Sequence, residues 1–117
     1  MPHVVLNGNV VVENIFETIQ PLMIRNQNSV LRTVDVYLER KKNVILIDSL
    51  TIEADKKIAF LVMISGREDG IVIRLYPKIS VEKTEGVKKI IGEIAKQLIA
   101  TFPQLKIGET NLQDYLK

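Results

Sequence analysis

The clearest pattern in the chain is a series of four β-rich runs between residues 30 and 76. The runs cover residues 30–40, 44–53, 58–65 and 71–76. Three short polar turns, at residues 41–43, 54–56 and 66–69, separate them. Connections this short join antiparallel neighbours. The sequence therefore predicts a four-strand antiparallel meander.

Two helices are predicted around this meander. Asn14 and Glu17 form a capping-box pattern, and the helix after them should kink at Pro21. A second, longer helix should begin after Ser80 and end at Pro103. Its apolar positions follow helical spacing. They are Val87, Ile90, Ile91, Ile94, Ala95, Leu98, Ile99 and Phe102.

The two ends of the chain carry weaker patterns. Residues 4–6 and 10–12 are β-branched or apolar and flank Asn7-Gly8-Asn9, which fits one bulged strand or a short hairpin; we favour the bulged strand. The tail, residues 103–117, contains a short helical pattern after Thr110. Gly92, in the middle of the long helix, suggests a close approach between helix and sheet.

These elements predict one α+β domain over residues 1–117, in the order β-α-β-β-β-β-α. A length of 117 residues favours a single domain. Two helices on an antiparallel sheet form a two-layer sandwich with the long C-terminal helix on one face. The other face of the sheet is then left without a covering layer.

The turn lengths also predict which residues occupy that second face. Three-residue turns pair Leu38 with Leu46 and Leu50 with Phe60, and a four-residue turn pairs Val62 with Ile73. One row of the second face is then apolar throughout, and the neighbouring rows are mixed. The candidate binding residues are Tyr37, Ile47, Met63 and Val72 in the apolar row, with Leu61, Arg74 and Tyr76 beside it.

An apolar patch of this kind marks an interface, a groove or a ligand site. Three explanations remain open. The tail, the first hairpin or a bent sheet could cover the face within the monomer. A second copy of the chain could cover it in a homodimer. Another protein or a ligand could bind there.

Asp48 interrupts the most apolar run of the chain, residues 44–50. In the predicted register it points toward the helix, where a carboxylate needs a partner or must be neutralised. It could be a functional acid, a hydrogen-bonded structural acid, or a residue turned to solvent by a bulge. A two-residue loop at Lys41-Lys42 would instead place Asp35 opposite Asp48, where two carboxylates could hold a magnesium-type ion.

The residues of catalytic and metal sites are scarce. The chain has no cysteine and a single histidine, His3, which we expect near a frayed terminus. The glycines follow no phosphate-loop spacing. We therefore expect no metal, no cofactor and, on balance, no enzymatic activity.

The net charge and the hydropathy of the chain limit the classes of partner that we expect it to bind. The net charge of +2 is too balanced to indicate nucleic acid by itself, although residues 56–117 hold 11 basic and 7 acidic residues. No segment approaches the roughly 20 apolar residues of a membrane span. The first residues lack the pattern of a signal peptide, so we expect a cytoplasmic protein.

The leading functional hypothesis is a non-enzymatic binding or self-association module that uses the second sheet face. One alternative is a nucleic-acid-associated protein that uses Tyr37, Tyr76 and Arg74. Another is a small-molecule carrier or enzyme with a cavity between sheet and helix near Asp48. The order of elements over residues 4–102 resembles one repeat of the TATA-box-binding protein, and more loosely a steroid- or lipid-carrier fold. The first resemblance implies a bare sheet face presented to a partner.

Overall fold

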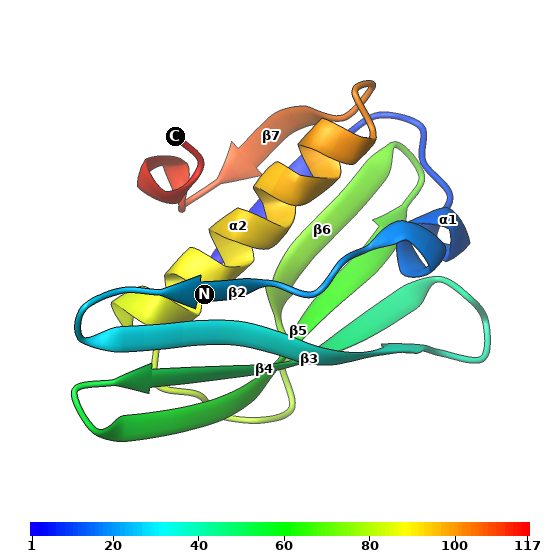
Figure 1. Ribbon diagram of the computed structural model, residues 1–117. Helices are drawn as coiled ribbons and strands as arrows, with labels where there is room; N and C mark the ends of the chain where they lie inside the picture. Colours follow the sequence, from blue (N-terminus) through cyan, green and yellow to red (C-terminus); the bar gives the residue numbers. More distant parts are fainter.

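The four meander strands form the middle of a seven-stranded antiparallel sheet, with the long helix packed on one face (Figure 1). The computed structural model describes all residues, 1–117, and confirms the predicted α+β class. Its elements in chain order are β1 (His3–Asn7), α1 (Val12–Thr18), β2 (Met23–Arg25), β3 (Ser29–Leu38), β4 (Val44–Glu53), β5 (Lys56–Arg67), β6 (Gly70–Leu75), α2 (Glu85–Thr101), β7 (Lys106–Thr110) and the 3-10 turn η1 (Gln113–Tyr115).

The strand order across the sheet is β2-β3-β4-β5-β6-β1-β7. The sheet curls, so that β2 at one edge and β7 at the other flank α2 (Figure 1). The first strand lies between β6 and β7, which places both chain ends in one region of the fold. The shape is therefore a curled half-barrel around one helix, with a concave inner face and an uncovered outer face.

The inner face and α2 form one continuous apolar core. A cluster of 21 buried residues joins the strands to the helix. Each large aliphatic side chain in such a core stabilises the fold by about 1.5–3 kcal/mol relative to exposure. The largest fully buried side chains are Leu6, Ile15, Leu31, Ile45, Ile47, Ile64, Ile71, Ile73, Ile90, Ile91, Ile94 and Leu98.

Strands β2 and β7 were not predicted, and β1 ends earlier than predicted. The first helix stops at Thr18, before Pro21, and the chain continues as β2, which pairs Met23 with Arg32. The tail contributes β7 beside β1 before the short helical turn. Neither version of the predicted residue 4–12 pairing is correct, because β1 ends at Asn7 and Gly8, at φ 140°, turns the chain toward α1.

The turn between β4 and β5 has two residues, not three. Ala54 and Asp55 both have positive φ, 48° and 69°, as a type I′ hairpin requires. Glu53 therefore pairs with Lys56, and Leu50 pairs with Ala59 in place of the expected Phe60. The shift of one residue exchanges the two faces of β4 relative to β5.

The β3–β4 pairing carries a bulge. Tyr37 pairs with Leu46 near the turn, where Lys42 and not Asn43 adopts positive φ. The register then slips between Thr33 and Val36, so that two residues of β3 lie opposite Asp48 alone. Thr33 consequently faces inward and is only 5 % exposed.

The β5–β6 pairing differs from the prediction by two residues. Val62 pairs with Leu75, and Ile73 pairs with Ile64. Because side chains alternate with a period of two, a shift of two leaves every side chain on its expected face. The outward residues of these two strands were therefore predicted correctly.

The start of α2 is fixed by a carboxylate on β4. The helix is capped by Thr84, four residues later than the expected Ser80. The Thr84 hydroxyl accepts from the Val87 amide and donates to Glu53, whose other oxygen accepts from the Gly86 amide at 3.0 Å. Partial burial raises the pKa of Glu53, but hydrogen bonds to the carboxylate, led by that from Thr84, and the charge of Lys56 together outweigh burial, so the pKa lies below its ordinary value.

Gly92 permits a close approach, but to the tail and not to the sheet. A Cβ at this position would lie 2.6 Å from the backbone oxygen of Tyr115 and 2.7 Å from its Cβ. The tail therefore docks on α2 and covers the helix. It leaves the outer face of the sheet free.

We expect Glu53→Gln to lower the free energy of unfolding at pH 7 by about 1–2 kcal/mol, the size of a lost helix cap. Since the folded pKa is below the unfolded one, this stability is present above the unfolded value of about 4.3 and is lost as pH falls through the folded pKa. Urea unfolding of both proteins from pH 7 to pH 3 should show the difference shrinking.

Glu82→Gln is the matched control, because Glu82 forms only an exposed ion pair with Lys56. A destabilisation by Glu53→Gln that stays constant down to pH 3 would mean that the carboxylate charge plays no part.

Candidate functional site

The outer face of the sheet, opposite α2, is the only broad surface of the sheet that no helix covers. Its central row crosses five strands through direct pairs. The row runs Tyr37, Leu46, Met63, Arg74 and His3. A parallel row runs from the bulge of β3 through Asp48 to Leu61.

All of the candidate residues except Ile47 lie on or beside this face. Ile47 is 1 % exposed and packs in the core beneath α2, because β4 presents its even-numbered residues outward. Leu46 takes the place assigned to Ile47. Met63 and Val72 do face outward, yet neighbouring side chains leave them only 8 % and 6 % exposed.

A groove with a volume of about 510 Å³ crosses the outer face. Its floor includes Val44, Leu46 and Met63 from the central strands. Tyr37 lies on one side, and Tyr76 and Lys78, which follow β6, lie on the other. The structure therefore brings together two of the aromatic residues that the sequence suggested, with an apolar surface between them.

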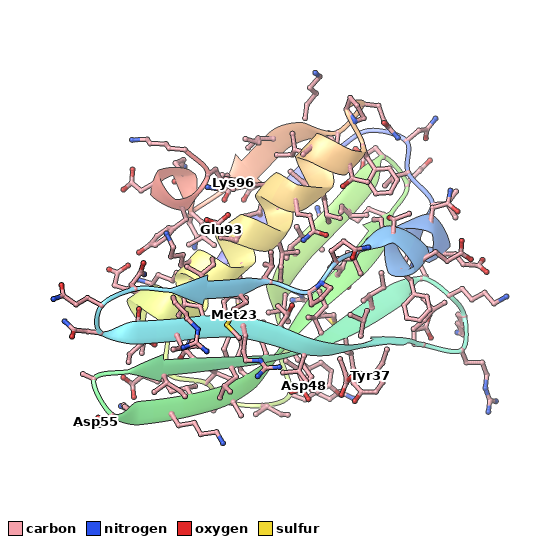
Figure 2. The ribbon with its side chains drawn as sticks, in the orientation of Figure 1. Met23, Tyr37, Asp48, Asp55, Glu93 and Lys96 are labelled. Atoms are coloured by element: carbon pink, nitrogen blue, oxygen red, sulfur yellow. The ribbon has the colours of Figure 1, made fainter.

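Two carboxylates, Asp35 and Asp48, lie near Tyr37. Figure 2 shows Asp48 and Tyr37 together on the side of the sheet away from α2. Asp35 most strongly, and Asp48 to a smaller extent, raise the pKa of the Tyr37 hydroxyl, because their negative charges oppose the phenolate. Neither aspartate is in an ion pair. The outer face thus carries an acidic spot without a cationic partner.

The orientation of Asp48 corrects the sequence prediction. Asp48 lies between two inward residues, Ile47 and Ser49, each 1 % exposed, and it points outward. The bulge places Asp35 next to it, as in the alternative register, although the connecting loop is not a two-residue loop. No third histidine or carboxylate joins the two into a metal-binding group.

The outer face that carries Asp35 and Asp48 also carries an arginine and several exposed apolar side chains. Arg32 on β3 faces outward between Met23 and Leu50 and forms no ion pair. Its Nε is closed off from solvent without a hydrogen-bond acceptor. The exposed apolar residues of this region are Met23, Val34, Tyr37 and Ile52, between 38 % and 52 % exposed.

His3 lies in a strand and not at a frayed end. Its amide donates to Asn111, and its ring contacts the Met1 carbonyl oxygen at 3.0 Å. The nearest carboxylate, on Glu109, lies 3.9 Å from Nε2. No nucleophile and acid are aligned around this ring as acyl-transfer chemistry requires.

Sequence reasoning missed Leu46 and Arg32 as outer-face residues. The signal for Leu46 is Asp55, because aspartate tolerates the left-handed conformation that a two-residue turn needs. No sequence feature indicates that Arg32 faces outward, since nothing in the sequence of β3 marks the bulge in that strand.

No protein-family model, curated protein or solved structure matches this chain. No helix of the structure combines the length and apolar character that crossing a bilayer requires. Function must therefore be argued from the geometry of the outer face.

We expect Asp35→Asn to lower the pKa of Tyr37 toward its ordinary value of 10.0, because the change removes the larger of the two opposing charges. Phenolate absorbance, measured with and without an added Tyr37→Phe change, isolates this tyrosine from the other two.

Asp55→Asn serves as the control, because Asp55 lies at the distant tip of the β4–β5 hairpin (Figure 2). Equal titration of Tyr37 in the wild type and in Asp35→Asn would show that the bulge does not bring Asp35 to the tyrosine.

Proposed function

We propose that this protein is a non-enzymatic binding module that acts as a homodimer, joined through the outer face of β2, β3 and β4. The dimer patch is defined by its exposed apolar residues and its unpaired charges. Its members are Met23, Arg32, Val34, Asp35, Tyr37, Asp48 and Ile52. The observation that carries the proposal is the presence of unpaired charges of both signs on this one uncovered, partly apolar surface.

The apolar part of the patch supplies a driving force. Exposed aliphatic and aromatic side chains that gather on one surface commonly mark an interface. Burying about 400 Å² of apolar surface at roughly 25 cal/mol per Å² would contribute about 10 kcal/mol before the costs of association. A standard interface takes about 800 Å² from each partner, roughly an eighth of the 6781 Å² that the chain exposes.

The charges favour a second copy of this chain as the partner. A two-fold interface brings the same patch of both copies together, so that each residue meets its complement on the other copy. Arg32 lies one row away from Asp48 on the same patch, and neither residue has an ion-pair partner within the monomer. Facing copies would pair each arginine with the other copy's carboxylates and would fix their relative orientation.

The groove beside the patch gives the dimer a binding surface. It opens next to Tyr37 and continues to Tyr76 and Lys78, which lie outside the patch. The proposal places this dimer in the cytoplasm, consistent with a chain that has no cysteine to pair in an oxidising compartment.

The other two hypotheses receive less support from the geometry. Asp35 and Asp48 lie beside Tyr37, where their charges would repel the phosphates of a nucleic acid stacked on that ring. The carrier hypothesis needs space between sheet and helix near Asp48. That space holds the buried side chains of β4, and Asp48 points away from it.

We expect the wild type to sediment as a dimer, at twice the 13.3 kDa mass of the chain. Asp48→Arg alone should weaken the dimer by placing arginines opposite each other. Arg32→Asp alone should do the same with carboxylates. An equimolar mixture of the two variants should restore a dimer, because each chain then meets its charge complement on the other.

Ile107→Lys is the control, since it changes the charge of an exposed residue on β7, at the opposite edge of the sheet. A wild type that remains monomeric at high concentration excludes the proposal. Variants that dissociate but are not rescued by mixing exclude the assigned charge pairing.

A further inference from the structure

A second concave site lies on the other half of the outer face, over β1, β5 and β6. It is a pocket of about 430 Å³ whose lining includes Arg67, Arg74, Ser65 and His3. The sheet order separates it from the dimer patch, because β5, β6 and β1 follow β4 in the direction away from β2. Nothing in the proposed homodimer makes use of this pocket.

Arg74 is the central residue of the pocket. Its backbone pairs with Met63 on one side and His3 on the other, so the arginine is positioned by strands in the middle of the sheet. It has no ion-pair partner, and its Nε is shut off from solvent without an acceptor. An unsatisfied buried donor on a charged group is costly unless something compensates it.

The charges around Arg74 do not provide that compensation. Arg67, at the end of β5, adds a second positive charge and likewise has no ion-pair partner. The one carboxylate in the lining belongs to Glu109, whose side chain is 87 % exposed and lies toward His3. The pocket therefore holds two arginines against one exposed, solvated acid.

The remaining lining is suited to an organic molecule. Ser65 supplies a hydroxyl, and its pair with Val72 lies between the Met63–Arg74 and Arg67–Gly70 pairs that hold the two arginines. Val72 and Val5 form an apolar surface, 6 % and 9 % exposed. Arginine is the residue that best recognises phosphate and carboxylate groups, through its planar fork of donors.

We propose that this pocket binds a small organic anion, whose phosphate or carboxylate group is held by Arg74 and Arg67 and whose apolar part lies on Val72. The site adds a ligand to the proposed binding module, and its existence does not depend on dimer formation.

Inorganic phosphate and acetate are suitable test ligands, because they separate the two oxyanion chemistries. We expect phosphate, acetate or both to cause saturable shifts of the Ser65 and Val72 amide resonances at constant ionic strength. A response to phosphate alone assigns a phosphoryl group, a response to acetate alone assigns a carboxylate, and a response to both assigns an oxyanion site of broad specificity.

Arg74→Gln should weaken binding of the responding anion about tenfold, the loss expected for a charge-assisted hydrogen bond. Arg67→Gln, at an exposed position near the turn, should weaken anion binding by a smaller factor. This variant tests the proposal if Arg74→Gln does not fold. Arg25→Gln is the control, because Arg25 also lacks an ion pair but lies on β2.

Asp48→Arg separates this inference from the proposed dimer, since a monomeric variant should still bind the anion. The absence of saturable shifts at millimolar phosphate and acetate would overturn the proposal. Equal weakening by Arg25→Gln and Arg67→Gln would also overturn it, because it would indicate general charge attraction and no defined site.

Discussion

The fold depends on the alternation of side chains along β4, an inner strand of the curled sheet. Ile45 and Ile47 lie beneath α2, while Leu46 and Asp48 lie on the outer face. A slip of one residue would bury a carboxylate and expose two isoleucines, which is costly in both directions. This single constraint decides which side chains meet the helix and which remain for a partner.

Two local features hold β4 in that register. The left-handed pair Ala54-Asp55 sets its pairing with β5, and the bulge of β3 adjusts the other side. Glu53, at the end of the same strand, caps α2 and ties the helix to the hairpin. Sheet register and helix position are therefore coupled through three consecutive residues, the last of β4 and the two of the turn that follows it.

Much of the fold was accessible from sequence because strong patterns determine it. The long helix, the four meander strands and the outward faces of β5 and β6 follow from periodicity. The face of β4 was missed because Ala54 gives no sign that it adopts positive φ. The strands β2 and β7 were missed because three and five residues carry too little periodicity, and tertiary pairing decides their conformation.

The candidate site, like the fold, was predicted from the sequence only in part. Met63, Leu61, Arg74 and Tyr76 were assigned correctly to the outer face because β5 and β6 kept the expected alternation. Tyr37 was assigned correctly because it lies on the turn side of the bulge in β3. The sequence offered the proximity of Asp35 and Asp48 only as an alternative register, because this proximity depends on a bulge in β3 that the sequence does not mark. The outer face consequently combines an acidic, partly apolar half with a basic pocket, a division that composition alone does not reveal.

The facing of β4 can be measured directly, because the chain has no native cysteine. Asp48→Cys and Ser49→Cys place single thiols at adjacent positions of the strand, one outward and one beneath α2. In native protein dilute enough to be monomeric, we expect a thiol reagent to label position 48 rapidly and position 49 only on unfolding. Rapid labelling at 49 with protection at 48 would contradict the register of β4 and the proposed dimer patch.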